Sequence, residues 1–246
     1  MVGKSEIKFI KSLHQKKYRI LNQCFIAEGE KVIRELLDSD FELQKLYTTT
    51  PGILGVSEAF STKVSEAQLS QISGLKTPNK VLAVFKMRPS AKVDPHGICL
   101  LLDDVRDPGN FGTIIRLCDW FGVDDLVCSR ETVDMYNPKV VMSTMGSLSR
   151  VNIVYVDLPE FVKNDGRPVV VTRMEGENVY RADLEENVLL VMGNEANGVS
   201  ETMMKIASGS LSIPRFGKLQ ETESLNVATA TAILLSEYRR RSINGK

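Results

Sequence analysis

The 246-residue sequence contains no apolar run that approaches the roughly 18 residues needed to cross a membrane, and its longest runs are pieces such as Ile98–Leu102. Residues 1–17 lack the apolar core of a secretory signal. The four cysteines form no CxxC pair and there are only two histidines, which disfavours a zinc site. We therefore expect a reduced, cytoplasmic protein with no membrane partner and no metal.

The sequence also lacks an excess of charge of one sign, because 31 basic residues balance 31 acidic ones. The charges are unevenly distributed along the chain. Residues 1–92 contain 15 Lys and Arg and 9 Asp and Glu, whereas residues 93–246 contain 16 Lys and Arg and 22 Asp and Glu. A basic half predicts contact with a polyanion such as an RNA backbone, and the alternative is an ordinary solvated, lysine-rich helix face. The predicted RNA-binding residues are Lys8, Lys11, Lys16, Lys17 and Arg19.

Residues 1–92 are predicted to form a small α/β domain that begins with one basic helix over about 5–21. Helices are also expected over about 28–37 and 57–72. Strands are expected over 24–27, 43–49 and 80–86. The segment 88–97 contains two prolines and few apolar residues, which predicts a linker.

The second domain, predicted over 98–246, alternates apolar strands with helices. Its last helix is expected over about 225–241. Continuous apolar strands that alternate with helices favour an α/β fold with a mostly parallel sheet covered on both faces. The expected strands are 98–102, 125–128, 152–156, 168–172, 188–192 and 210–213.

In such a sheet, ligands bind at the carboxyl ends of the strands, and three of these ends carry unusual residues. The loop that begins Asp103-Asp104 leads through Pro108-Gly109 to Asn110, which we expect to cap the next helix. Arg116 lies within that helix among apolar residues. Either it has a functional role, or it is a half-buried arginine paired with a strand aspartate.

The second loop points to a ligand other than a dinucleotide, and the third begins the last helix. The second has glycines at 193 and 198, but Glu195 stands where a dinucleotide-binding loop needs its middle glycine, which disfavours NAD and FAD. The sequence also has no P-loop pattern. In the third loop, Ser224 is a candidate N-cap for the last helix, and Asn226 is a poor helix former that requires another explanation.

Taken in this order, the three loops resemble motifs 1, 2 and 3 of the SpoU (TrmH-like) branch of the SPOUT RNA methyltransferases, over most of residues 98–241. Residues 24–37 are similar to the substrate-binding domain that precedes the catalytic domain in many members. The resemblance implies a deep trefoil knot, a homodimer, and S-adenosylmethionine (SAM) as the methyl donor. It also implies that the substrate is a ribose 2′-hydroxyl in rRNA or tRNA.

The resemblance further implies roles for individual residues. Arg116 is the expected catalytic residue, and its action as a base or as an electrostatic stabiliser stays open. The expected catalytic set is Asn110, Arg116, Glu195, Ser224 and Asn226, and the expected SAM-binding set is Gly193, Glu195, Gly198, Ile213 and Leu225.

Motif 3 departs from the family pattern in two ways. Six residues, Lys218–Glu223, separate Gly217 from Ser224 where about three are usual, and Arg215 replaces a common methionine. The departure favours one alternative, a non-catalytic RNA-binding or ribosome-assembly factor on the same fold. The intact motif residues favour the methyltransferase.

Overall fold

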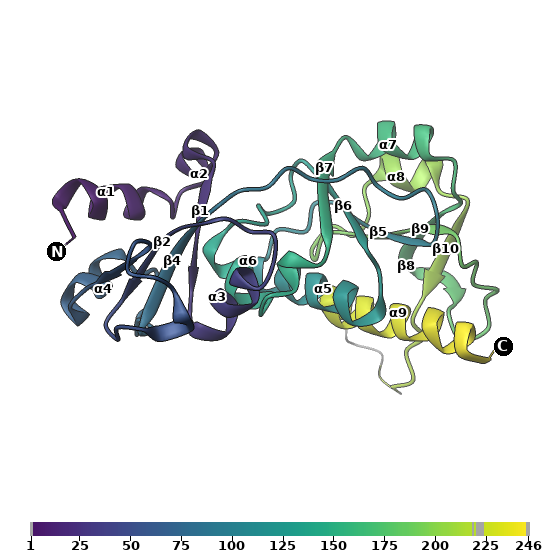
Figure 1. Cartoon of the computed structure of the whole chain (residues 1–246). Coiled ribbons are helices and arrows are strands. Elements are labelled where there is room, and N and C mark those ends of the chain that lie inside the picture. Colours follow the sequence, from purple (N-terminus) through teal and green to yellow (C-terminus); the bar gives the residue numbers. More distant parts are fainter. Residues whose placement is uncertain (1, 218, 220–223, 245–246) are drawn as a thin grey trace. The chain divides into compact units, whose positions relative to one another are not determined.

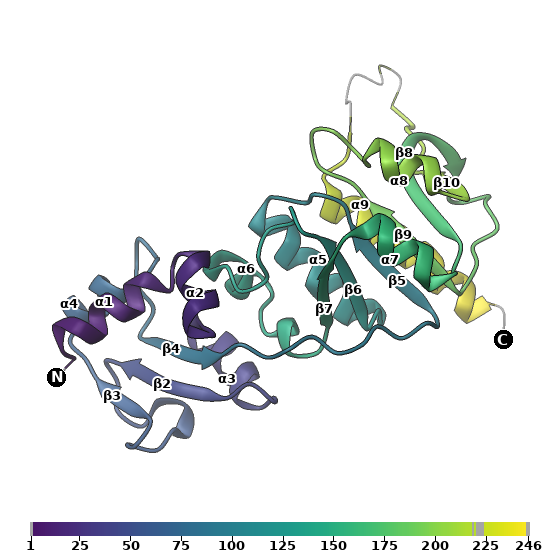
Figure 2. The ribbon, with the colours of Figure 1, turned by 90° about the horizontal axis from the view of Figure 1, so that it is seen from above.

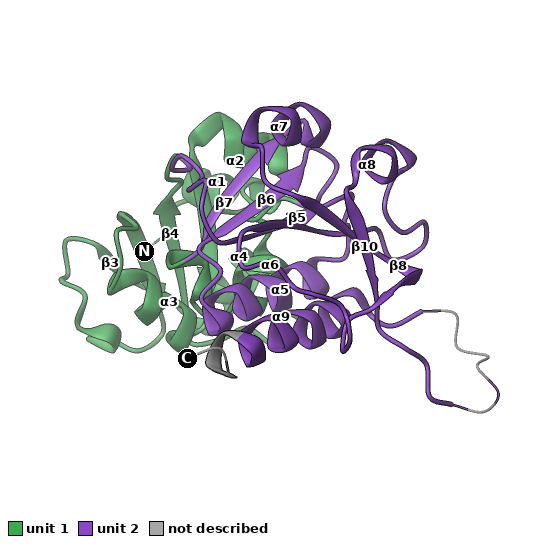
Figure 3. Cartoon of the chain, turned by 90° about the vertical axis from the view of Figure 1, so that its right-hand side faces the viewer, with its two compact units in different colours: residues 1–89, 134–150 green, residues 90–133, 151–246 purple. Residues whose placement is uncertain are grey.

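The computed structural model describes residues 2–217, 219 and 224–244. The chain forms two compact units (Figure 3). Unit 1 comprises residues 1–89 and 134–150, and unit 2 comprises residues 90–133 and 151–246. The first unit therefore includes a segment that lies far from it in the sequence, and the domain boundaries near 92 and 98 stay predictions.

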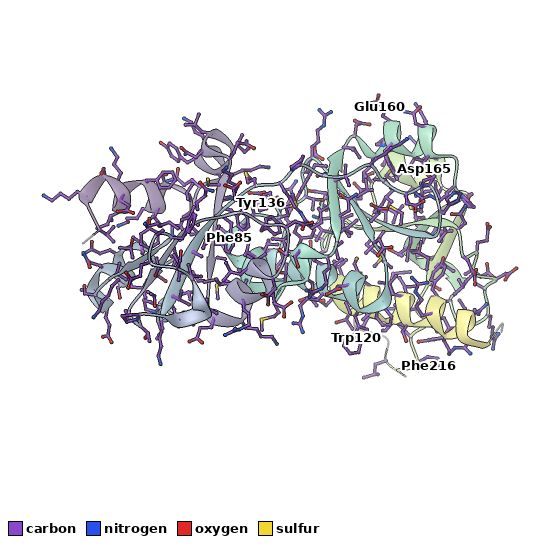
Figure 4. All side chains as sticks on the ribbon, viewed as in Figure 1. Phe85, Trp120, Tyr136, Glu160, Asp165 and Phe216 are labelled. Atoms are coloured by element: carbon purple, nitrogen blue, oxygen red, sulfur yellow. The ribbon has the colours of Figure 1, made fainter. Side chains whose placement is uncertain are left out.

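Unit 1 is built on a four-stranded sheet in the order β1 (Cys24–Glu28), β4 (Val81–Lys86), β2 (Leu43–Thr48), β3 (Ser61–Lys63). The β1–β4 and β2–β4 pairs are antiparallel, and the β2–β3 pair is parallel. Successive side chains of β1 point to opposite faces of the sheet, as in any β-strand. Ile26 joins one apolar core, whereas Phe25 packs on the other face against Phe85 and Tyr136 (Figure 4).

The helices of unit 1 differ from the predicted ones at its N-terminus. The single helix expected over 5–21 is wrong: α1 (Lys4–Ser12) and α2 (Lys16–Asn22) are separate. The chain breaks at Leu13, whose side chain is fully buried and whose carbonyl oxygen accepts a hydrogen bond from Arg19 Nη1 at 2.9 Å. The helix expected over 57–72 is also shorter. Strand β3 takes up part of that range, after the 3-10 turn η1 (Ile53–Gly55). Helix α4 (Glu66–Ile72) begins only after a capping box on Ser65. The remaining helix from this part of the chain is α3 (Glu30–Leu37).

Segment 134–150 connects two strands of unit 2 but packs within unit 1. It carries α6 (Pro138–Ser143) and the 3-10 turn η2 (Ser147–Ser149). Asp134 accepts hydrogen bonds from Arg19 Nε and Nη2 at 3.0 and 2.5 Å. Arg88, expected in a linker, instead stacks on Phe41 and donates to the Leu148 and Ser149 carbonyl oxygens.

Unit 2 contains a six-stranded sheet in which each of the adjacent pairs is parallel. Helices α5 (Pro108–Phe121) and α9 (Val227–Asn244) cover one face, and α7 (Leu158–Asp165) and α8 (Glu201–Ile206) cover the other (Figures 1 and 2). The predicted α/β fold, with a small N-terminal unit and a parallel C-terminal sheet, is confirmed. The knotted chain path stays a prediction of the resemblance. The sheet order is β10 (Gly209–Ser212), β8 (Val169–Asn178), β9 (Val188–Met192), β5 (Ile98–Leu102), β6 (Asp125–Ser129), β7 (Asn152–Val156).

This strand order has a switch point between β5 and β9. From β5 the chain adds β6 and β7 on one side, and then builds β8, β9 and β10 on the other. The loops that follow β5 and β9 therefore leave neighbouring strands at the same edge of the sheet. Ligands in open α/β sheets bind outside the carboxyl ends of the strands at such a point.

Candidate functional site

The loop that follows β9 is closed on itself by backbone hydrogen bonds. The amide of Asn194 donates to the carbonyl oxygen of Gly198, and the reverse bond has the same length, 2.9 Å. A Cβ on Gly193 would lie 2.2 Å from the carbonyl carbon of Gly198, and Gly198 has φ +68°. Both glycines are therefore required by the fold of this loop, which projects Glu195 from its tip.

Asn110 is not the N-cap of α5, so this part of the sequence interpretation is wrong. Asp107 is the cap, because its Oδ1 accepts the backbone N–H of Asn110 at 2.8 Å and Pro108 follows it in the first helical position. The Asn110 side chain is thereby free to turn toward the neighbouring loops. Its Nδ2 donates to Glu195 Oε1 at 3.0 Å.

Asn226 completes a chain of three side chains from the three predicted motifs. Its Nδ2 donates to Asn110 Oδ1 at 2.8 Å, and its Oδ1 accepts the backbone N–H groups of Ala228 and Thr229 at 3.0 and 3.2 Å. Asn226 is thus the N-cap of α9, which begins at Val227, and the prediction of Ser224 as the cap is wrong. Capping accounts for the poor helix former at this position, and the amide nitrogen remains available for Asn110.

A cavity of about 1440 Å³ opens beside this chain of side chains. Its walls combine apolar groups with the carboxylate of Glu195 and the side chains of Arg173 and Arg215. Such a lining suits a ligand that has an apolar body and charged groups of both signs. Every predicted cofactor-binding residue lines it: Gly193, Glu195, Gly198, Ile213 and Leu225, together with Ser224.

The sequence interpretation missed one wall of the cavity, formed by Thr172, Arg173 and Met174 in the middle of β8. On β10, Ser210 pairs with Val171 and the next residue, Leu211, pairs with Glu177. Residues 172–176 therefore have no partner on β10, and the first three of them line the cavity. The strand expected here ends at 172, so the sequence pattern carries no signal for this part of β8. The inserted motif 3 loop lies outside the described residues except for Leu219.

Arg116 is exposed on the outer side of α5. Within the described part of the chain it has no hydrogen-bond or ion-pair partner, and it does not line the cavity. The structural alternative, a half-buried arginine paired with a strand aspartate, is therefore wrong. Its guanidinium is available to a molecule from outside this chain.

The basic N-terminal residues are not equivalent. Lys8, Lys11, Lys16 and Lys17 are exposed on α1 and α2, as a polyanion-binding surface requires. Arg19 is only 2% exposed, and its guanidinium is occupied by Asp134 and the Leu13 carbonyl oxygen. The prediction that Arg19 contacts RNA is therefore wrong, because its charge is neutralised inside the protein.

The described residues offer neither a metal site nor a membrane-spanning helix. Among the described residues, no group of three or more His, Cys, Asp and Glu side chains could hold a metal ion. Of the helices that the structure describes, none has the length and apolar character to cross a membrane.

Both parts of the chain match known protein families. Residues 97–236 match the SpoU rRNA Methylase family, and residues 4–83 match the MRM3-like substrate binding domain. The chain is 33% identical to the 23S rRNA (guanosine(2553)-2′-O)-methyltransferase RlmP of Bacillus subtilis, with 95% of this chain and 96% of that protein covered.

Solved structures give the same result. A protein of the TrmH family from Porphyromonas gingivalis is 36% identical with a TM-score of 0.87, and the match covers 98% of this chain and 99% of that one. An AdoMet-bound rRNA methyltransferase from Sinorhizobium meliloti is 31% identical with a TM-score of 0.86, over 98% and 97% of the two chains.

Proposed function

The chain belongs to the SpoU rRNA Methylase family, and we propose that it transfers the methyl group of SAM to a ribose 2′-hydroxyl of ribosomal RNA. The observation that carries the proposal is the hydrogen-bonded chain Glu195–Asn110–Asn226, which joins the three motif loops beside the cavity. The relative from B. subtilis, which this chain matches over both units, is named for a 23S rRNA nucleotide. That match supports rRNA as the substrate.

The cavity fits SAM by its chemistry. SAM, when bound, supplies a methyl group that is activated by a sulfonium. Glu195 places a carboxylate in a mostly apolar wall, where it favours the positive charge of the sulfonium, and Arg173 and Arg215 in the same lining suit the carboxylate of SAM. Ile213 and Leu225 supply apolar surface, and the close-packed glycines bring backbone near the ligand. We assign these residues to cofactor binding.

The remaining chemistry is alignment and assistance to the attacking oxygen. Alignment of reacting groups alone lowers a barrier by up to roughly 7–11 kcal/mol in well-oriented cases. Arginine is a poor base because it is almost never deprotonated in proteins. We therefore assign Arg116 to the electrostatic stabilisation of the developing alkoxide and the adjacent phosphate. Asn110, Asn226 and Ser224 are assigned to the orientation of Glu195 and the ribose.

Substrate RNA also requires a surface beyond the reacting atoms. We propose that unit 1 supplies it through Lys8, Lys11, Lys16 and Lys17, since the matching family domain is a substrate-binding one. Recognition of a 2′-hydroxyl restricts the substrate to RNA.

We further propose a homodimer in which each site borrows Arg116 from the partner. Arg116 does not line the cavity of its own chain, and the only tryptophan, Trp120, stands one helical turn further along α5 with 83% of its surface exposed (Figure 4). Exposed aromatic residues are typical anchors of protein interfaces. Helix α9 also carries small residues, but Ala228 is buried within unit 2 and Ala230 lines the cavity, so we place the interface on α5.

A cytoplasmic location accords with the rRNA substrate and with the cysteines. All four are unpaired and buried, and burial raises the pKa of the Cys99 thiol to about 12. Thiols of this kind need no oxidising compartment.

The test is transfer of labelled methyl groups from SAM to total RNA from cells that lack this protein. We expect label in rRNA, at one ribose whose 3′ phosphodiester becomes resistant to alkali. RNA from cells that contain the protein is the control and should accept little label. Label in a base, label only in tRNA, or binding of SAM without any transfer would contradict the proposal.

A further inference from the structure

Asp104, the second residue after β5, has an unusual backbone conformation. Its φ of +62° lies in the left-handed region, which few residues other than glycine adopt. Its backbone N–H donates to Ser129 Oγ at 3.0 Å, and its carboxylate accepts Arg106 Nε at 2.6 Å. A conformation of this kind persists only where the surrounding contacts hold it in place, and such residues gather at functional sites.

The left-handed turn presents the carbonyl oxygen of Asp104 to the loop after β9. This oxygen accepts a hydrogen bond from Asn194 Nδ2 at 2.7 Å, and the Asp104 carboxylate oxygen Oδ2 accepts a longer one from the same nitrogen at 3.5 Å. At its other end, Asn194 Oδ1 accepts the backbone N–H groups of Ala196 and Asn197 at 2.9 and 3.1 Å. The side chain amide is therefore fully occupied within the protein, although Asn194 borders the cavity.

These bonds link the two loops that must meet for Glu195 to reach Asn110. Asn110 belongs to the chain that follows Asp104, and Glu195 is the residue after Asn194. This link holds together the two partners of a 3.0 Å hydrogen bond that lie 85 residues apart in the sequence. The same two loops are also joined at their bases, where Asp103 Oδ2 accepts the backbone N–H of Ser200 at 2.7 Å. The backbone pair of Asn194 with Gly198 closes the tip of the loop but does not connect it to the other loop.

We propose that Asn194, held by the Asp104 carbonyl oxygen, is a positioning residue that aims Glu195 at Asn110 before cofactor and RNA bind. This inference rests on the proposed function for its catalytic consequence. Its structural part, the order of the loop in the free protein, does not depend on that function.

The test separates the two ends of the Asn194 side chain. Asn194→Asp keeps the acceptor for Ala196 and Asn197 but removes the donor to Asp104, and Asn194→Ala removes both. Asp104→Gly keeps the carbonyl oxygen and suits a positive φ. We expect both Asn194 variants to lower kcat by about 10–100-fold and to weaken SAM binding by a smaller factor, because Glu195 also lines the cofactor cavity, and Asp104→Gly to stay within about threefold of wild type in both quantities.

A double-mutant cycle with Glu195→Gln distinguishes positioning from a general loss of structure. If Asn194 acts through Glu195, Asn194→Ala adds little to the loss caused by Glu195→Gln alone. Multiplicative losses, or an Asp104→Gly variant as impaired as Asn194→Asp, would overturn the inference. The exposed Asn164→Asp on α7 is the matched control and should behave as wild type.

Hydrogen exchange of the cofactor-free protein supplies a readout without catalysis. The amides of Ala196 and Asn197 should exchange faster in Asn194→Ala than in wild type, while Asn164→Asp leaves them unchanged. Equal exchange in wild type and Asn194→Ala would refute the preformed loop. If exchange responds as expected but wild type transfers no methyl group, the proposed function fails and the positioned loop stands.

Discussion

Arg116 combines an exposed position with the absence of a partner in the described part of its own chain. Arg116→Ala should therefore leave the free energy of unfolding within about 0.5 kcal/mol of wild type, as expected for a surface substitution. Methyl transfer should be abolished, and SAM binding should be nearly unchanged. Denaturant unfolding, calorimetry of SAM binding and single-turnover transfer measure the three quantities.

Lys163→Ala on α7, on the opposite face of the sheet, is the control for loss of a surface cation (Figure 1). Turnover of Arg116→Ala within about tenfold of wild type, or roughly 1.4 kcal/mol in the barrier, would exclude a catalytic role.

Arg19 illustrates the opposite case, a cation that serves stability. Removal of one partner from a buried ion pair costs about 3–5 kcal/mol because the other charge remains buried and uncompensated. Asp134→Ala should destabilise the protein by about this amount in denaturant unfolding, since Arg19 is 2% exposed. Arg19→Met combined with Asp134→Leu should recover much of the loss.

Lys17→Ala, on the same helix but exposed, should change the free energy of unfolding by no more than about 0.5 kcal/mol. An Asp134→Ala variant as stable as this control would show that the ion pair contributes nothing.

At the scale of elements, Asn226 both caps α9 and donates a hydrogen bond to Asn110, and substitutions can separate these two roles. Asn226→Asp keeps the oxygen that caps α9 but cannot donate to Asn110 Oδ1, so we expect wild-type stability with reduced methyl transfer. Asn226→Ala also loses the cap and should cost a further 0.5–2 kcal/mol or so of stability. Thermal unfolding and transfer rates measure the two effects; equal stability of the two variants would refute the capping role.

The N-termini of α5 and α9 show which features of the site could be predicted from the sequence and which could not. The three loops and their motif residues could be predicted because strand ends and turn residues are local patterns. The choice of Asp107 over Asn110 and of Asn226 over Ser224 as caps could not, because each member of a pair is a good capping residue. The Asp-Pro pair at 107–108 is the signal that would have identified the first cap.

Two other features could not be predicted from the sequence because they depend on residues that are distant along the chain. Nothing local distinguishes Arg19 from the neighbouring lysines, and its partner Asp134 lies 115 residues further along the chain. The contribution of β8 to the cavity wall likewise depends on its register with β10.

At the scale of the whole molecule, the charge division predicts salt-dependent RNA binding through unit 1. Replacement of Lys8, Lys11, Lys16 and Lys17 by Gln should weaken binding and lower the magnitude of the slope of log K against log salt by up to about 3.6, since each of the four lost phosphate contacts contributes about 0.7–0.9. A filter-binding titration over a salt series measures the slope. A variant with the exposed Lys92, Lys163 and Lys205 of unit 2 changed to Gln is the control, and an unchanged slope in the unit 1 variant would refute the prediction.

The oligomeric state provides the second test at this scale. Light scattering at low micromolar concentration should give about twice the chain mass of 27.4 kDa, and Trp120→Ala should give a mass near that of one chain. Phe60→Ala, an exposed aromatic residue in unit 1, is the control. Because Trp120 is the only tryptophan, dilution of the wild type should also shift its fluorescence to the red as the dimer dissociates. A wild-type mass near 27.4 kDa would exclude the dimer.

The position of residues 134–150 has a consequence for how such proteins can be recombined. The chain passes between the two units three times, after residues 89, 133 and 150. A chimera made at a single breakpoint near residue 92 would separate Asp134 and Tyr136 from Arg19 and Phe25, their partners in unit 1. Exchange of the RNA-binding unit between relatives therefore requires two inserts, residues 1–89 and 134–150, transplanted together from the same donor.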